Sequence, residues 1–342
     1  MFLCIFKNVI DYYHSSSSPV FICYVDASKA FDRVNYWLLF KKLLKRGVHH
    51  FVVKLSAYWY SHQCFQVLWD SCLSKSFNVS NGVRQGGVLS PYLFNVYTND
   101  LSIELNTSGV GCLYNDVLIN HLFYADDAAL LAPSAGALQK LINICECYAE
   151  KCDILFNVKK TVVMCIKPKW MAKCNVPNVF INGEPLKYVS FHKYLGNIMC
   201  SDFKDDLDIT NSLRGIYGRG NMLLKNFKFC TTSVKSHLFK TFCSSFYGMQ
   251  TWCNFKGVSL RKLRTAYNNV FRFLMKLPAM SSISYHMVYN DVDHFNVIHR
   301  NILTCFIKRL SHSSNHLVST VFNSMCFMYS TMNTTWLQIL LK

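Results

Sequence analysis

The sequence has 342 residues, of which 51% are hydrophobic, so it can form a large domain and a smaller one and is not a disordered tail. Its 36 Lys and Arg residues outweigh 19 Asp and Glu residues, and the resulting charge of +17 favours a polyanionic partner. Nucleic acid and an anionic membrane surface both fit this charge, and a basic surface also exists without any partner.

The N-terminal residues and the cysteines bear on where the protein works. The run MFLCIF is apolar, but Lys7 and Asp11 follow it, and no later run approaches the roughly 18 apolar residues of a membrane span. We therefore predict an intracellular protein of the nucleus or cytoplasm, neither secreted nor membrane-bound, whose 16 cysteines stay reduced. His312 and His316 could share a helix face, but Cys305 alone lies near them, so we expect no zinc site.

The first predicted strand ends at a carboxylate. A run of serines at 15–18 predicts a loop, and the β-rich residues 20–25 behind it predict a buried strand that leads to Asp26. Asn35 can cap the helix that follows, and Gly47 ends that helix.

The middle of the chain alternates short elements with turns. It predicts a helix at 50–60, strands at 65–69 and 76–79, and a glycine-punctuated loop at 81–87. Ser90 and Pro91 occupy the N-cap and the first position of a helix that runs to about residue 105.

A β-hairpin carries two further carboxylates. Apolar strands at 117–124 and 128–131 flank the short segment Ala125-Asp126-Asp127. Side chains at a hairpin tip are both positioned and exposed, as a site for chemistry requires.

The order of elements predicts the fold class. A helix at 135–150 and a strand at 161–166 complete a split β-α-β-β-α-β order, in which two helices cover one face of an antiparallel sheet. We expect the other face to be free for a ligand. Past residue 200 the pattern is helical, at 213–229, 234–247 and 260–277. The sequence thus predicts an α+β domain at 1–200 and an α-helical domain at 201–342.

Three carboxylates form the candidate catalytic set. Asp26 ends one strand, Asp126 and Asp127 lie on the hairpin tip, and in this fold the strands concerned are neighbours at the sheet centre. Clustered carboxylates repel one another unless cations are bound among them. Hard oxygen ligands select Mg²⁺, and two ions roughly 3.5 to 4 Å apart would clamp the attacking and leaving oxygens of a phosphoryl transfer.

Five segments, in order along the chain, resemble the catalytic motifs of reverse transcriptases from non-LTR (LINE, jockey-like) retrotransposons. They are Val25-Asp26-Ala27-Ser28-Lys29-Ala30-Phe31-Asp32, Arg84-Gln85-Gly86-Gly87-Val88-Leu89-Ser90-Pro91, Phe123-Tyr124-Ala125-Asp126-Asp127, Phe156-Asn157-Val158-Lys159-Lys160-Thr161 and Tyr194-Leu195-Gly196. The resemblance implies a polymerase palm followed by a thumb-like helical region.

The resemblance also implies the reaction and its metal site. An RNA-directed DNA polymerase transfers a nucleotide from a dNTP to a primer 3′-OH on an RNA template, with two Mg²⁺ ions for which Mn²⁺ can substitute. Asp26 and Asp126 would each contact both ions, and Asp127 would support them. Lys160 would protonate the departing pyrophosphate, although the adjacent Lys159 competes for that role and an ordinary surface lysine is the alternative.

Five further positions match the family's nucleotide site. Ala27 and Phe31 belong to the first motif, where the aromatic ring would exclude a 2′-hydroxyl; without the motif, Phe31 could equally be a core residue. Gln85 and Gly86 would lie against the template and the base, since glycine lets the backbone approach closely. Arg84 could reach a phosphate or remain a solvated side chain.

The remaining matches concern the primer and the duplex. Tyr194, Leu195 and Gly196 would grip the primer terminus, with an ordinary glycine turn as the alternative. Basic residues between aromatics in the tail could follow a phosphate backbone or form a solvated face; they are Arg214, Arg219, Lys225, Lys228, Lys235, Lys240, Arg261, Lys262, Arg264, Arg272 and Lys276.

The short segment before Asp26 bears on whether the chain is active. Only about 25 residues precede Asp26, whereas the family carries a substantial fingers region there, so we expect an N-terminally truncated chain with impaired activity. A catalytically inactive nucleic-acid-binding remnant is the alternative; an RNA-copying RNA polymerase is disfavoured by Tyr124-Ala125 and by Phe31. The acidic residues outside the motifs are expected on solvated faces or at helix caps: Asp100, Asp202, Asp205, Asp206 and Asp208.

Overall fold

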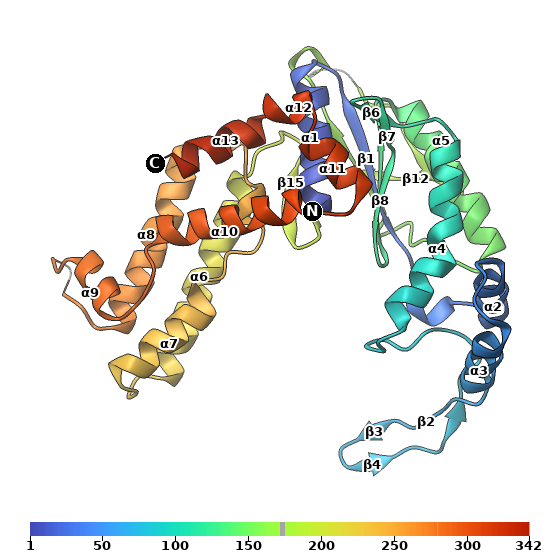
Figure 1. Ribbon diagram of the computed structural model, residues 1–342, viewed down its shortest axis with the longest axis horizontal. Helices are drawn as coiled ribbons and strands as arrows, with labels where there is room; N and C mark the ends of the chain where they lie inside the picture. The colour runs from blue at the N-terminus through green and yellow to red at the C-terminus, as the bar shows by residue number, and fades with distance from the viewer. Residues whose placement is uncertain (172–174, 279, 342) are drawn as a thin grey trace. The chain divides into compact units, whose positions relative to one another are not determined.

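The apolar run before Asp26 forms strand β1 (Val20–Asp26) in the computed structural model, which describes residues 1–171, 175–278 and 280–341. This strand lies in the middle of a five-stranded sheet with the order β13-β10-β1-β9-β8 (Figure 1). Strand β1 pairs antiparallel with β9 (Asp127–Ala132), which pairs antiparallel with β8 (His121–Tyr124). On the other side, β10 (Val162–Ile166) pairs in parallel with β13 (Lys187–Tyr188).

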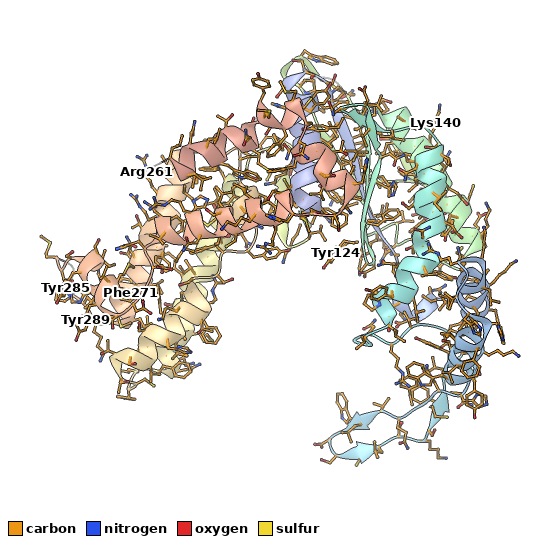
Figure 2. The ribbon with its side chains drawn as sticks, viewed as in Figure 1. Tyr124, Lys140, Arg261, Phe271, Tyr285 and Tyr289 are labelled. Atoms are coloured by element: carbon orange, nitrogen blue, oxygen red, sulfur yellow. The ribbon has the colours of Figure 1, made fainter. Side chains whose placement is uncertain are left out.

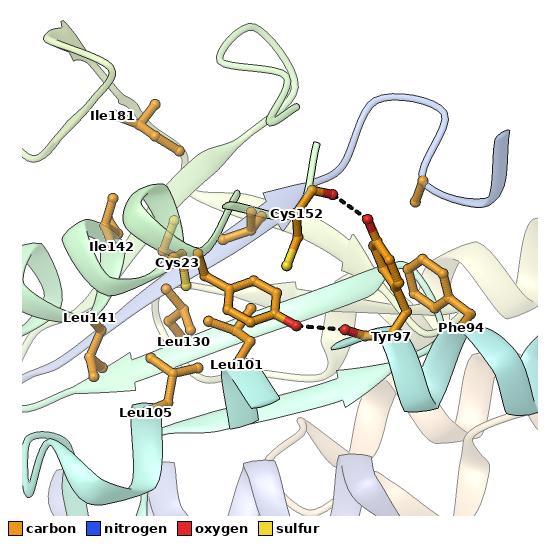
Figure 3. Close-up of a cluster of buried hydrophobic side chains, with 14 of the residues drawn as sticks. Cys23, Phe94, Tyr97, Leu101, Leu105, Leu130, Leu141, Ile142, Cys152 and Ile181 are labelled. Carbon is orange, nitrogen blue, oxygen red and sulfur yellow. Dashed lines mark hydrogen bonds between the residues drawn. The ribbon is translucent and has the colours of Figure 1, made fainter. Parts of the chain in front are cut away.

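Helices α4 (Ser90–Thr107) and α5 (Ala135–Lys151) contribute to the core that packs against the sheet. Figure 3 shows this core. The hydroxyl of Tyr148 donates to the main-chain oxygen of Tyr97, and the hydroxyl of Tyr97 donates to the main-chain oxygen of Cys152. Burial raises the pKa of Tyr97 to about 12. The expected open face of the sheet is wrong for β1, because all of its residues from 20 to 25 are buried.

The shorter elements of this region have the bounds α2 (Tyr36–Lys45), α3 (His50–Ser61), β2 (Cys64–Phe65), β3 (Leu68–Trp69), β4 (Cys72–Leu73), β5 (Phe77–Asn78), β6 (Cys112–Tyr114), β7 (Val117–Ile119), β11 (Phe180–Ile181), β12 (Glu184–Pro185) and the 3-10 turns η1 (Phe31–Arg33) and η2 (Lys169–Met171). The helix predicted at 50–60 is confirmed as α3, whereas the single strand predicted at 65–69 is wrong, because β2 pairs with β5 and β3 pairs with β4. Asn35 caps α2 as predicted, because its side chain accepts from two main-chain N–H groups. Ser90 does not cap α4: Leu89 holds that position, and the Ser90 hydroxyl donates to the main-chain oxygen of Arg84.

The strand predicted at 117–124 is divided in two. Residues 117–119 pair with β6, and residues 121–124 pair with β9. The buried Asn120 separates them, since its side-chain amide donates to the main-chain oxygens of Leu105 and Val110. An amide side chain with partners off the sheet interrupts a strand that hydrophobicity alone predicts as continuous.

The rest of the chain is mainly helical, with bounds α1 (Phe2–Ser15), β14 (Phe191–Tyr194), β15 (Asn197–Cys200), α6 (Asp206–Asn226), α7 (Thr232–Cys243), η3 (Met249–Thr251), α8 (Gly257–Leu274), α9 (Ile283–Tyr289), α10 (Phe295–Ser311), α11 (His316–Phe322), α12 (Met325–Met328) and α13 (Thr331–Leu340). The three predicted tail helices are confirmed as α6, α7 and α8. Across the described ranges, no helix is both long enough and apolar enough to cross a membrane.

The chain divides into two compact units. The sheet unit comprises 19–165 and 171–189, and the C-terminal unit comprises 1–18, 166–170 and 190–342. Helix α1 and the β14–β15 hairpin thus group with the helical tail. The domains predicted at 1–200 and 201–342 stay a prediction.

A buried ion pair joins α1 to the rest of the C-terminal unit. The Lys7 ammonium donates to Asp205 and to the main-chain oxygen of Thr251. Asp205 also accepts the main-chain N–H groups of Cys253 and Asn254. Burial opposes the charge on Lys7, but the carboxylates around it, Asp205 first, hold the Lys7 pKa above its ordinary value. Of the two predicted settings, a solvated face is therefore wrong for Asp205; the residue holds the N-cap position of α6, but its side chain makes no cap hydrogen bond.

Asp208 is likewise a structural residue. It accepts from the Trp252 indole N–H at 2.7 Å, from the main-chain N–H of Ile198 at 2.9 Å and from the Asn197 amide at 3.1 Å. This carboxylate therefore fastens α6 to the strand after the hairpin turn, and the predicted solvated or capping role is wrong for it as well.

Breaking the buried pair should destabilise the C-terminal unit. Lys7→Met leaves Asp205 charged and buried, so we expect the free energy of unfolding to fall by about 3 to 5 kcal/mol in urea titrations followed by circular dichroism. Lys204→Met is the matched control, because Lys204 pairs with Asp202 at the surface, where such pairs contribute about 0 to 1 kcal/mol. Equal losses in the two variants would contradict the assignment.

Candidate active site

The three candidate carboxylates lie at one end of the central strands. Asp26 and Asp127 are directly paired across β1 and β9, and Tyr124 pairs with Asp127 to close the hairpin. Asp126 lies in the turn itself, after Ala125 with φ of +54°, and Figure 2 shows Tyr124 at the tip of the hairpin. The prediction that the strands carrying these carboxylates are neighbours at the sheet centre is confirmed by the pairing of β1 with β9.

The carboxylates influence one another electrostatically. Burial, and then the charges of Asp126 and Asp26, raise the pKa of Asp127 above its ordinary value. The Lys160 ammonium lies 4.0 Å from Asp26, but both side chains are too exposed for a strong pair. Within the described ranges, no three His, Cys, Asp or Glu side chains converge as a ready-made metal site.

Main-chain bonds hold the fourth motif beside the first. The N–H of Asp26 donates to the hydroxyl of the fully buried Thr161 at 3.2 Å, and the N–H of Asn157 donates to the Asp26 carbonyl at 2.8 Å. The Asn157 carbonyl in turn accepts from Lys160 and Thr161 and closes a tight turn. These bonds explain why Lys160, 134 residues further along the chain than Asp26, lies next to it.

Phe31 is held against a helix. Its ring stacks on Phe94 of α4, with centroids 4.7 Å apart and an interplanar angle of 18°, and the side chain stays half-buried. Ala27, which directly follows strand β1, forms an isolated antiparallel bridge with Phe156. A half-buried ring with a rigid neighbour can act as a wall, as the resemblance implies for Phe31.

The second motif is attached to the first through glycine. The N–H of Val83 donates to the Phe31 carbonyl at 2.7 Å, and the N–H of Gly82 donates to the Val34 carbonyl at 2.9 Å. A Cβ on Gly82 would lie 2.8 Å from the backbone of Asp32, so another residue would push the loop away. This close approach positions Gln85, which is exposed.

Arg84 has aromatic neighbours. Its guanidinium carbon lies 5.1 Å from the ring centre of Phe65 and 5.7 Å from that of Trp59. These cation–π contacts hold the exposed Arg84 side chain beside Trp59 of α3 and Phe65 of β2. Gly86 has φ of +80°, which shapes the turn after Gln85.

The predicted primer grip is the turn of the β14–β15 hairpin. Leu195 and Gly196 both have positive φ, and Tyr194 pairs with Asn197 across them. Tyr194 is buried, and a Cβ on Gly196 would lie 2.7 Å from the Tyr247 ring. This hairpin belongs to the C-terminal unit, whereas the carboxylates belong to the sheet unit.

Two supporting residues escaped the sequence reasoning. Thr161 carries the hydroxyl that binds the Asp26 main chain, and Phe94 carries the ring behind Phe31. The position of Thr161 directly after Lys160 was a usable signal, because a hydroxyl at a strand entrance often binds a neighbouring main chain. Nothing in the local pattern distinguishes Phe94 from an ordinary core residue.

A sheet with carboxylates at the end of its central strands, followed by a helical region, is the palm and thumb-like arrangement of a templated polymerase. The family model described as reverse transcriptase (RNA-dependent DNA polymerase) matches residues 5–199. The chain belongs to this reverse transcriptase family and is a domain of the non-LTR retrotransposon type.

The chain is also similar to known RNA-directed DNA polymerases of mobile elements. The RNA-directed DNA polymerases from the mobile element jockey of Drosophila funebris and Drosophila melanogaster are 28% and 27% identical to this chain over 270 residues. That alignment covers 75% of this chain and 28% of each relative, so the chain spans little more than a quarter of their length. The solved telomerase of Candida tropicalis with the TWJ fragment of telomeric RNA aligns over 98% of this chain and 51% of its own, at 13% identity and a TM-score of 0.47.

The crowding of carboxylates can be tested by titration. Asp126→Asn removes one of the two neighbouring charges that raise the pKa of Asp127, so we expect that pKa to fall toward its ordinary value. Carbon-13 NMR of the Asp127 carboxyl as a function of pH measures the change. Asp32→Asn is the control, because Asp32 contributes nothing to the Asp127 shift. An unchanged Asp127 pKa in Asp126→Asn would contradict the site geometry.

Proposed function

We propose that this chain catalyses RNA-templated DNA synthesis, transferring a nucleotide from a dNTP to a primer 3′-OH. The observation that carries the proposal is the direct pairing of Asp26 with Asp127, with Asp126 in the adjoining turn. Such a reaction needs little covalent chemistry from the protein and depends on positioning and on neutralising phosphate charge. A retrotransposon polymerase of this kind works inside the cell, in the nucleus or cytoplasm.

The donor set fits Mg²⁺. All three side chains offer carboxylate oxygens. Burial first, and then the charges of Asp126 and Asp26, raise the pKa of Asp127, and a bound cation would favour its charged form. Asp26 and Asp126 would hold two ions between them, with Asp127 beside them, and Mn²⁺ could substitute. The ions would supply charge neutralisation at the attacking and leaving oxygens.

The chain's own residues would bind and orient the substrates. Lys160 would donate a proton to the pyrophosphate oxygen, since main-chain bonds hold it near Asp26. Phe31 and Ala27 would line the sugar, with Phe94 as the rigid backing of the Phe31 ring. Gln85 would lie against the template base.

The other proposed contacts involve charge and backbone approach. Gly86 would admit the template backbone, and Arg84 would reach a phosphate only by leaving its two aromatic neighbours. Residues 194–196 would hold the DNA primer end. The palm at 1–200 and the thumb-like region at 201–342 would each contact the RNA template and primer, with basic tail residues on the phosphate backbone.

Replacing a carboxylate should abolish catalysis. Asp26→Asn or Asp126→Asn removes a ligand of the ions, so we expect Mg²⁺-dependent primer extension on poly(rA)/oligo(dT) to fall by about a thousandfold or more. The measurement uses the chain extended at its N-terminus with the corresponding segment of a jockey relative. Asp32→Asn, an exposed carboxylate in the same motif, should retain extension. If the unaltered extended chain binds primer–template but never extends it, the inactive remnant is the correct reading.

Sugar selection should depend on Phe31. In the same extended chain, Phe31→Ala opens space beside the 2′ carbon, and we expect the ratio of rNTP to dNTP incorporation efficiency to rise by about tenfold or more. Single-nucleotide extension with each substrate measures this ratio. Phe77→Ala, which truncates an exposed aromatic ring of the β2–β5 ribbon, is the control and should leave the ratio unchanged. An unchanged ratio in Phe31→Ala would make Phe31 a core residue.

A further inference from the structure

A cavity of about 570 Å³ lies within the C-terminal unit, between α8, α10 and α13. Three arginines line it: Arg261 and Arg264, one turn apart on α8, and Arg300 on α10 (Figure 2 labels Arg261). In the part of the chain that the structure describes, these guanidinium groups have no ion pair or hydrogen bond, and no Asp or Glu lines the cavity.

The cavity gathers three cationic side chains around one hollow whose lining holds no carboxylate. Elsewhere in the same unit, Lys7 pairs with Asp205 and Lys240 pairs with Asp291. Three like charges around one hollow repel one another, so an anion bound there would lower the free energy. Guanidinium groups bind phosphate in a bidentate manner, which makes a phosphate-bearing ligand the best match.

The remaining lining offers places for a base as well as a phosphate. The side-chain amides of Asn296 and Gln338 supply hydrogen-bond donors and acceptors, and the half-buried Phe255 supplies a ring. His299 is only 5% exposed, its ring nitrogens have no hydrogen bond within the described ranges, and burial lowers its pKa to about 4. It is therefore neutral near pH 7, with one donor and one acceptor available to a ligand.

We infer that this cavity binds an unpaired nucleotide of a single-stranded nucleic acid, with the strand phosphates on Arg261, Arg264 and Arg300. A cavity of about 570 Å³ has room for a single nucleotide, whereas a duplex is too wide to enter it. The inference rests on the proposed function only in that both take nucleic acid as the partner. It requires neither the carboxylates of the sheet unit nor any step of polymerisation.

Binding is measured on the full chain carrying Asp126→Asn, by fluorescence anisotropy with a labelled single-stranded oligo(U) RNA and with a blunt duplex. Arg264→Gln/Arg300→Gln should weaken oligo(U) binding by about tenfold and reduce the slope of log affinity against log salt by about 1.4, since two phosphate contacts are lost. Lys308→Gln/Arg309→Gln removes the same charge from exposed residues at the end of α10 and should change the affinity less than about twofold.

An uncharged variant that fills the cavity tests whether the hollow itself is needed for binding, independently of the arginine charges. Gln338→Trp fills the hollow from the exposed side of α13 and should weaken oligo(U) binding by about fivefold or more while duplex binding is retained. Thermal unfolding confirms that each variant is folded. A Gln338→Trp chain that is folded and binds oligo(U) normally would overturn the inference, as would equal losses in the two charge variants.

Free UTP serves as a competitor. If UTP displaces oligo(U) at concentrations equal to those of the RNA itself, the cavity binds a free nucleotide and the strand assignment is overturned. Primer extension by the N-terminally extended chain with Asp126 intact is the separate test of the polymerase. If that chain extends primers but the unaltered cavity does not bind oligo(U), the cavity site alone is refuted; if the unaltered cavity binds oligo(U) but the extended chain never extends a primer, the polymerase alone is refuted.

Discussion

The end of strand β1 is the constraint on which the candidate site depends. At Asp26, the main chain pairs with Asp127 on one side and bonds to Thr161 and Asn157 on the other. Three segments that are distant in sequence thereby meet at one residue. Each bond is modest by itself, but together they fix the main chain from which the Asp26 carboxylate extends.

The two proposed sites differ in the sign of the charges that they bring together. At the carboxylates, like charges are crowded and a divalent cation would relieve them. In the helical cavity, guanidinium groups are gathered without a counter-charge, and an anion would relieve them. By contrast, the charges that stabilise the fold, such as Lys7 with Asp205, are buried and fully paired. The two proposed binding sites thus each gather charges of one sign, whereas the buried charges within the fold are paired.

Sequence reasoning succeeded where the signal for a feature lies within a few neighbouring residues. The cap at Asn35, the carboxylates at the hairpin tip and the three tail helices follow from patterns within a few residues, and the structure confirms them. It failed where a polar side chain finds distant partners. Asn120 interrupts a strand because it bonds to Leu105 and Val110, and Asp208 is buried because Trp252 and Ile198 donate to it.

By itself, the sequence determined the family, the order of the elements and the identity of the three carboxylates, because motif residues and period-two strands are local properties of the chain. Only the tertiary structure decided which residues support the predicted site residues, such as Phe94 behind Phe31. It also decided where α1 packs. The arginine cavity was also beyond sequence reasoning. Residues 261, 264 and 300 look like scattered basic positions until the packing of α8, α10 and α13 brings them around one hollow without a carboxylate.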